Sequence, residues 1–301
     1  MKGDIDIFLD YLSREKRCSE NTLCAYKNDL NQLAGFVQAK TAETGAQPCW
    51  AGLDPGLVID YVHDLKVKKY APATVARKIA TAKSFLSCMV AMGKLQANPT
   101  EQLASPRVDK PLPTSLSVSE VRALLAEPAK LETPEAKRDC AMLQLLYATG
   151  MRVSQLVSLD LADVDTVACN VRCSSRAAGP REIPVDGPVV RQVTDYVNGA
   201  RAELDRDGQQ ALFLNQRGER LTRQGFWLIL KGYARKAAIS KAVTPHTLRH
   251  SFATHMLRGG APLRNVQELL GHANMSTTQV YTKLTDDMVR QVYEKAHPRA
   301  K

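Results

Sequence analysis

The feature that most constrains the fold is a proline-rich stretch about one third of the way along the chain. It runs from Pro99 to Pro113 and holds two further prolines. Proline lacks a backbone N–H donor and clashes with the preceding helical turn, so this stretch excludes a continuous helix or a central strand. We therefore predict two domains: a helical domain at residues 1–105, a linker at 106–115, and a second domain at 116–301.

The net positive charge of both parts of the chain is consistent with a polyanionic partner. The 301 residues carry a formal charge of +10. Residues 1–113 hold 15 Lys and Arg against 12 Asp and Glu, which leaves 26 against 19 for the rest. An excess of positive charge in both parts is expected of a protein that binds nucleic acid with both domains. A protein whose surface is merely basic and solvated would have the same excess.

Cysteine usage and hydropathy narrow the class further. The seven cysteines are scattered, and none forms a Cys-x-x-Cys pair. This pattern predicts neither a disulfide framework nor a zinc site. The first residues carry early acids unlike a signal peptide, and no apolar run reaches transmembrane length. We expect a cytoplasmic protein that needs no metal and no membrane.

Hydrophobic periodicity predicts a mainly helical fold. Apolar residues at helical spacing mark four helices in the first domain, the first through Ile5, Phe8 and Leu12 and the fourth from about Pro72. The second domain should be mixed α+β. Its expected elements are a helix capped by Ser117, a buried helix over 136–149 ended by Gly150, a hairpin with strands at 167–173 and 181–185, and helices at about 187–204, 222–238 and 246–258.

Candidate catalytic residues gather at two predicted helix ends and one downstream segment. Pro245 predicts a helix start that places His246 and Arg249 in the first turn, and Arg152 follows the tight end at Gly150. Arginines at such positions can hold phosphate oxygens. Tyr281 lies downstream and could attack the phosphorus as a nucleophile. A covalent phosphotyrosine conserves the bond energy, and the chain has no GxxxxGK[ST] motif for ATP, so we expect no cofactor.

Each of these residues has a structural alternative. A lone histidine on a helix is more often a packed side chain than a catalyst, and a tyrosine near a chain end is usually a packing residue. Arg152 could instead form an ion pair with Asp160 or Asp163. The combination of the residues carries the chemical prediction.

Three segments resemble the tyrosine recombinase (phage integrase) family. They are Ala148–Ser154, His246–His255 and Leu269–Tyr281, and the likeness extends over nearly the whole chain. Within the family the chain is most similar to the Xer recombinases, and its tail Ala296–Lys301 resembles the XerC group. The resemblance implies a helical core-binding domain followed by a mixed α+β catalytic domain.

The resemblance also implies a role for each matching residue. Arg152 and Arg249 would clamp the scissile phosphate. His246 would assist proton transfer, and His272 would complete the phosphate shell. Tyr281 would attack to give a 3′-phosphotyrosine and a free 5′-hydroxyl.

The family normally has a lysine in the hairpin as general acid for the leaving oxygen, and this chain has Arg176 there. No lysine occurs between Lys137 and Lys231. Arginine, with a pKa of ~12.5–13.8 against ~10.4 for lysine, is a poor proton donor. Arg172 and Arg181 are the alternative hairpin residues. Gln155 likewise stands where the family usually has an acid that orients the catalytic arginine.

The resemblance implies double-stranded DNA with paired half-sites as the partner. It further implies a homo- or hetero-tetramer with a related recombinase, linked through a C-terminal helix at about 286–301. Chromosome or plasmid dimer resolution is the expected function. The alternatives are integration of a phage or mobile element, a relaxase of the type IB topoisomerase kind, and DNA binding with weakened catalysis. Candidate DNA-facing residues are Arg77, Lys78, Lys83, Arg220, Arg223, Lys231 and Arg235.

Overall fold

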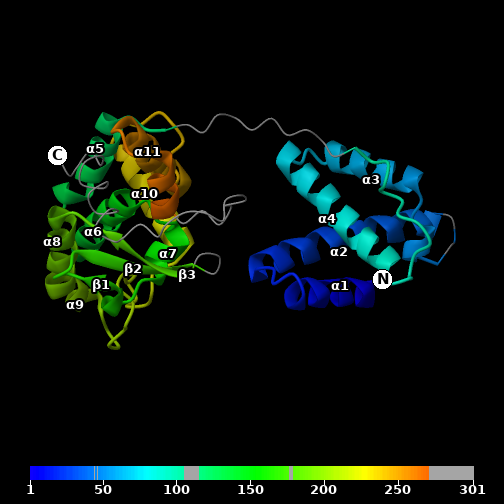
Figure 1. The fold of residues 1–301 in the computed structure, drawn as a ribbon, viewed down its shortest axis with the longest axis horizontal. Coiled ribbons are helices and arrows are strands. Elements are labelled where there is room, and N and C mark those ends of the chain that lie inside the picture. The colour runs from blue at the N-terminus through cyan, green and yellow to red at the C-terminus, as the bar shows by residue number, and fades with distance from the viewer. Residues whose placement is uncertain (44, 46, 105–114, 176–178, 271–301) are drawn as a thin grey trace. The chain divides into compact units, whose positions relative to one another are not determined.

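The computed structural model describes residues 1–43, 45, 47–104, 115–175 and 179–270. The chain divides into two compact units, Met1–Pro111 and Leu112–Lys301, which are treated separately below (Figure 1). Most of the predicted linker at 106–115, all of the predicted C-terminal helix at 286–301, Arg176, His272 and Tyr281 lie outside the described residues. No described helix is both long enough and apolar enough to cross a membrane.

The N-terminal unit is built from the four helices that its apolar spacing predicts. Aromatic rings fill its core: the Phe8 and Phe85 ring centroids are 5.4 Å apart at a steep angle, and the Trp50 ring lies 4.8 Å from that of Phe85. Edge-on contacts of this kind suit the ring quadrupoles. The helices are α1 (Lys2–Arg14), α2 (Glu20–Glu43), α3 (Pro55–Val67) and α4 (Pro72–Ala91).

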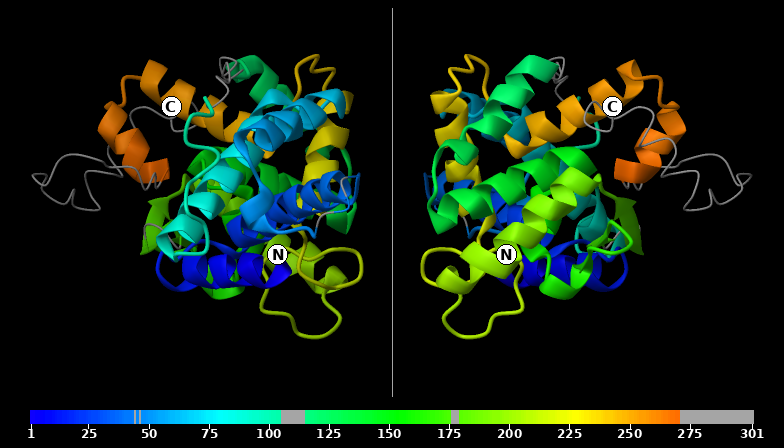
Figure 2. Two further views of the ribbon diagram at one scale, coloured as in Figure 1. Left: turned by 90° about the vertical axis from the view of Figure 1, so that its right-hand side faces the viewer. Right: turned by 90° about the vertical axis from the view of Figure 1, so that its left-hand side faces the viewer.

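The second unit is organised around α6 (Pro134–Thr149), whose side chains are buried on nearly every face. The predicted cap is present at the start of α5, where Ser117 accepts from the Glu120 N–H and Glu120 accepts from the Ser117 N–H. The other helices are α5 (Val118–Ala126), α7 (Val153–Ser158), α8 (Gly187–Asp195), α9 (Arg201–Leu204), α10 (Arg223–Lys236), α11 (Pro245–Arg258) and α12 (Leu263–Leu270). Figure 2 shows α11 and α12, drawn in orange, which contact each other.

A small antiparallel sheet completes the unit, in the order β1 (Val164–Asp165), β2 (Asn170–Ser175) and β3 (Gly179–Pro184). The β2–β3 hairpin confirms the predicted one, although β2 begins three residues later than expected. The Asp165 carboxylate accepts the N–H groups of Val167 and Ala168, and Cys169 has a φ of 54°. These local bonds form a turn in place of the first part of the expected strand.

The helix expected over 187–204 is confirmed as one continuous helical segment, made of α8, a π-helical turn at Tyr196–Ala200, and α9. Helices α7 and α12 lie where no helix was expected. The fold class itself, mainly α with a small β component and a helical N-terminal domain, is confirmed.

Candidate functional site

Arg249 is the most firmly held of the predicted site residues. Helix α11 begins as predicted, because Thr244 accepts the Thr247 N–H at 3.0 Å and proline occupies the first helical position. The Arg249 side chain is 7% exposed. Its Nη1 donates to the Gly150 carbonyl at 2.6 Å and its Nη2 to the Leu270 carbonyl at 2.7 Å. Two backbone oxygens on separate elements therefore fix the direction of the guanidinium.

Gly150 provides one of those oxygens from a backbone position that only glycine suits. It ends α6 in the left-handed region, with φ 59° and ψ 17°. A Cβ added there would lie 2.3 Å from Cδ1 of Phe252. The close packing of the α11 ring on this glycine is what brings the Gly150 carbonyl to Arg249.

Arg152 lies two residues further along, at the start of α7, and its side chain is exposed. Its backbone N–H donates to Oε1 of Gln155 at 3.0 Å. The Gln155 amide in turn donates through Nε2 to the Ser174 carbonyl at 3.1 Å. Gln155 thus ties the start of α7 to strand β2, and a carboxylate at this position could accept the first bond but could not donate the second.

The two alternative hairpin arginines face opposite sides of the sheet. Arg172 is exposed and lies 3.7 Å from the Glu182 carboxylate. Arg181 pairs across the hairpin with Cys173, on the face that also buries Ile183. Alternation along the strands therefore directs Arg181 inward and Arg172 outward.

The charges of neighbouring arginines affect Arg249 and Arg181. Burial, together with the positive charges of Arg152 and Arg181, lowers the pKa of Arg249 to about 10. Burial also lowers the pKa of Arg181, and Arg152 adds to that effect. We call Arg152, Arg181 and Arg249 the guanidinium cluster. Within the described residues, none of the three forms an ion pair with a carboxylate.

His246 is exposed in the first turn of α11, one turn before Arg249. The structure therefore brings Arg152 and Arg249 together, and it adds Arg181, which the sequence offered only as an alternative. Arg176, His272 and Tyr281 lie outside the described residues, so their places in the site stay predictions. In the part of the chain that is described, no three His, Cys, Asp or Glu residues gather as a metal site.

The candidate DNA-facing residues of the N-terminal unit differ in exposure. Lys78 does not lie on the surface as expected, because it is 7% exposed and its Nζ is 2.9 Å from the Asp29 carboxylate and 2.6 Å from the Gln32 side-chain oxygen. Arg77 is half-exposed and also pairs with Asp29. Lys83 donates to the Leu103 carbonyl. The charge of Lys78 is therefore used inside the unit.

Three of the four later candidates lie on one helix. Arg223, Lys231 and Arg235 are exposed on α10, and the Lys231 ammonium lies 4.9 Å from the ring centroid of Trp227, which is itself exposed. A cation held over an aromatic face leaves both groups at the surface. Arg220 lies outside α10 and pairs with Asp160.

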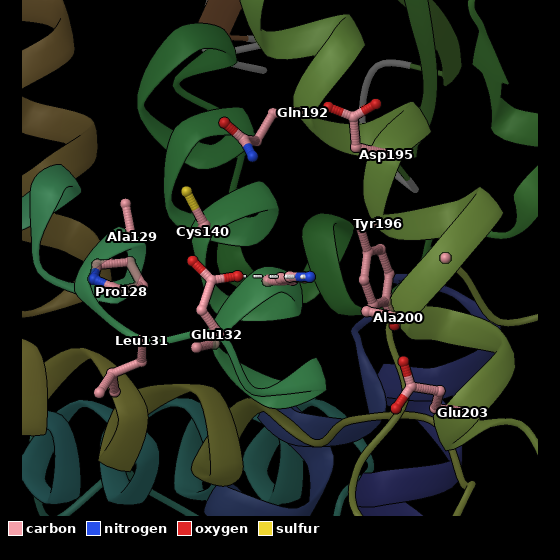
Figure 3. A pocket seen from close by; sticks show the side chains of 13 residues that line it. Pro128, Ala129, Leu131, Glu132, Cys140, Gln192, Asp195, Tyr196, Ala200 and Glu203 are labelled. Carbon is pink, nitrogen blue, oxygen red and sulfur yellow. Dashed lines mark ion pairs between the residues drawn. The ribbon is translucent and has the colours of Figure 1, made fainter.

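A pocket of about 400 Å³ lies elsewhere in the second unit, between α6, the turn before it and the π-helical turn (Figure 3). Glu132, Asp195 and Glu203 line it, and Lys137 lies 3.7 Å from Glu132. None of the predicted site residues is among its lining residues. The pocket is therefore separate from the guanidinium cluster, and its three carboxylates do not favour a nucleic acid.

A helical unit is thus followed by a mixed α+β unit that holds three arginines close together. Comparisons with known proteins agree. Residues 114–288 match the phage integrase family, and residues 5–93 match the N-terminal SAM-like domain of phage integrases. The chain belongs to this family.

Individual relatives show which members of the family the chain resembles. The chain is 46% identical over 288 residues to the tyrosine recombinase XerC of Herpetosiphon aurantiacus. The aligned region covers 95% of this chain and 92% of that protein. It is 28% identical to the XerA recombinase in a crystal structure, with a TM-score of 0.50 and 99% of each chain covered. The fold also matches the XerH site-specific recombinase bound to its difH substrate, with a TM-score of 0.70, 18% identity, and 97% and 83% of the two chains covered.

Proposed function

We propose that this chain is a site-specific DNA recombinase that uses Tyr281 as its nucleophile. The tyrosine oxygen forms a bond to phosphorus as the bond from phosphorus to the 5′-oxygen breaks. The products are a 3′-phosphotyrosyl linkage and a free 5′-hydroxyl, and the reversed attack rejoins a strand. No nucleotide enters this balance, because the phosphodiester energy is kept in the covalent intermediate, and arginines supply the positive charge at the phosphate.

The observation that carries the proposal is the fixed guanidinium of Arg249. Its hydrogen bonds to two backbone carbonyls fix its direction. The positive charge of Arg152 lies close enough to act on Arg249. Preorganised cations of this kind stabilise the charge that develops on phosphate oxygens in the transition state. His246 and His272 would assist proton transfer and complete the phosphate shell. Arg176 would stabilise charge on the leaving oxygen.

We further propose that the substrate is double-stranded DNA with paired half-sites and that the enzyme acts in the cytoplasm as a tetramer, either homomeric or shared with a related recombinase. Resolution of chromosome or plasmid dimers fits the identity to a XerC protein over almost the full length of both chains. Residues 1–105 and 116–301 would grip the duplex as two domains, with α10 supplying exposed cations. Residues 286–301 would contact a neighbouring subunit.

A second candidate function has its own support. With Arg176 in place of the hairpin lysine, proton donation to the leaving oxygen is weakened, and the chain could bind its site while cleaving slowly or only with an activating partner subunit. We expect a rate about 10–100-fold below that of a lysine-bearing protein.

One assay separates these functions. Wild type, Tyr281→Phe and Arg176→Lys are incubated with a nicked duplex selected from a random pool by the wild-type protein, and covalent protein–DNA adducts are counted over time. We expect an adduct for wild type, none for Tyr281→Phe, and a faster one for Arg176→Lys. A wild type that binds the duplex without forming an adduct would overturn the recombinase proposal.

A further inference from the structure

We propose that Arg181 binds the scissile phosphate as a third guanidinium, beside Arg152 and Arg249. The inference deepens the proposed function, on which it rests. The resemblance to the recombinase family implies two phosphate-clamping arginines, Arg152 and Arg249. The hairpin supplies this third one from strand β3.

The Arg181 side chain has buried donors without oxygen acceptors in the described residues. Its Nε, Nη1 and Nη2 are all buried, and no oxygen in the described residues accepts a hydrogen bond from any of them. The interactions that it makes there are with the thiol of Cys173, a weak acceptor. A guanidinium has five donors, and leaving them unmet in the interior is unfavourable unless an anion completes them.

The charge of the guanidinium cluster is not balanced by an ion pair with any described carboxylate. Arg152 lies close enough to Arg181 and Arg249 for its charge to lower their affinity for protons. Gln155, at the position beside the cluster where a carboxylate would compensate part of this charge, is neutral and is already bonded to Ser174. Three cations that pair with no described carboxylate favour an anion with more than one acceptor oxygen, such as a phosphodiester.

The direction of Arg181 also favours a phosphate ligand. Arg181 faces inward from β3, whereas Arg172, one residue before its cross-strand partner, faces outward and pairs with Glu182. Arg152 is exposed and marks the side from which an anion reaches the cluster. A phosphate that enters past Arg152 would meet the donors of Arg181 and Arg249 together.

Inorganic phosphate is the probe for this site. The thermal unfolding midpoint of the full chain is measured against phosphate concentration, with chloride holding the ionic strength constant, and the phosphate Kd is obtained from the shift. The variants are Arg181→Met, which keeps an apolar stem of similar length, Arg181→Lys, and the outward-facing control Arg172→Met. Since one charge-assisted contact is lost, Arg181→Met should weaken the phosphate Kd at least about tenfold.

The result expected for a phosphate ligand is weaker binding without a lower unfolding midpoint in phosphate-free buffer, because Arg181→Met removes like-charge repulsion. Arg172→Met should keep the wild-type Kd. A wild-type Kd for Arg181→Met, or a midpoint that falls sharply in phosphate-free buffer while the Kd is kept, would overturn the proposal. If Arg181→Met does not fold, Arg181→Lys tests the proposal in its place. Its single ammonium should bind phosphate several-fold more weakly than the wild-type guanidinium, and an unchanged phosphate Kd would contradict the proposal.

This measurement uses neither DNA nor the chemistry of Tyr281. Failure of the recombinase proposal would appear as a missing covalent adduct, whereas failure of the inference about Arg181 would appear as an unchanged phosphate Kd. The two outcomes are therefore distinguishable.

Discussion

Buried cations in the two units of this protein differ in whether a described carboxylate pairs with them. Within the second unit, Arg138 and Arg201 have such a partner, whereas Arg181 and Arg249 do not. In the N-terminal unit, Lys78 lies against Asp29, a carboxylate that is 2% exposed. In the second unit, Arg249 and Arg181 are held close to Arg152, and no described carboxylate pairs with them. A buried cation with its own anion is part of the architecture. A buried cation without one indicates that an anion comes from outside.

The N-terminal pair is a closed network. Asp29, on α2, accepts from Lys78, Arg77 and Thr81, all on α4. Every oxygen of the carboxylate is used, which is the condition for tolerating a buried ion pair. This network joins two helices of the bundle, and it holds the charge of Lys78 inside the unit.

Asp29→Asn should break this network and give the largest effect. Lys78 would stay buried without its anion, so the free energy of unfolding of the N-terminal unit should fall by about 3–5 kcal/mol. Hydrogen exchange of amides in α2 and α4 measures this change. The control is Asp10→Asn, whose ion pair with Arg14 is exposed and should contribute less than about 1 kcal/mol. Equal effects of the two substitutions would contradict the comparison.

Arg249→Lys tests the other side of the comparison. Lysine keeps the charge but loses the forked donors that reach two carbonyls, so the rate of covalent adduct formation should fall about 10²–10³-fold. Arg258→Lys, an exposed arginine on the same helix, serves as the control and should stay near the wild-type rate. Adduct formation within threefold of wild type for Arg249→Lys would show that its fixed direction is unimportant.

Gly150→Ala should displace the carbonyl that holds Arg249. The left-handed backbone and the contact with Phe252 together should lower the free energy of unfolding by about 3 kcal/mol. Denaturant unfolding measures it. Gly232→Ala, at an open position within α10, should instead stabilise by about 0.5–1 kcal/mol. A neutral Gly150→Ala would remove our explanation of how Arg249 is positioned.

His255 shows a third way to bury a base, which is to keep it neutral. Its ring nitrogen lies 2.8 Å from the Tyr147 hydroxyl, and burial lowers its pKa against a smaller upward effect from the Leu116 backbone. The folded state therefore resists protonation. Stability should be full above the ordinary histidine pKa of about 6.5 and should fall as the pH drops below it, by up to about 1.4 kcal/mol per pH unit.

The pH effect is checked by the free energy of unfolding between pH 7 and pH 5. His255→Gln should flatten the slope over this range, and the exposed control His63→Gln should keep it. An unchanged slope in His255→Gln would assign the pH dependence to other groups.

Much of the fold could be predicted from local patterns. Apolar spacing gave the four N-terminal helices, and capping residues located the starts of α5 and α11, because both signals act within a few residues. The same spacing was present in α12, through Val266, Leu269 and Leu270, and could have predicted it. The late start of β2 depended on bonds from the Asp165 carboxylate, which compete with strand pairing and leave no periodic signal.

The site was less accessible to sequence reasoning. The inward direction of Arg181 follows from alternation with Ile183, so that signal was available. Lys78 likewise lies within the apolar stripe of α4 between Val75 and Ala82, which indicates burial. The bond from Gln155 to the Ser174 carbonyl joins residues 19 apart, and no local pattern predicts it.

The central claim is that the guanidinium cluster, unlike the Asp29 network, awaits an anion. Hydrogen exchange of the full chain with and without inorganic phosphate, at constant ionic strength, tests it most directly. We predict that phosphate slows exchange in α7 and the first turns of α11 and leaves α2 and α4 unchanged. Equal slowing in both units, or no slowing around α7 and α11, would contradict the account.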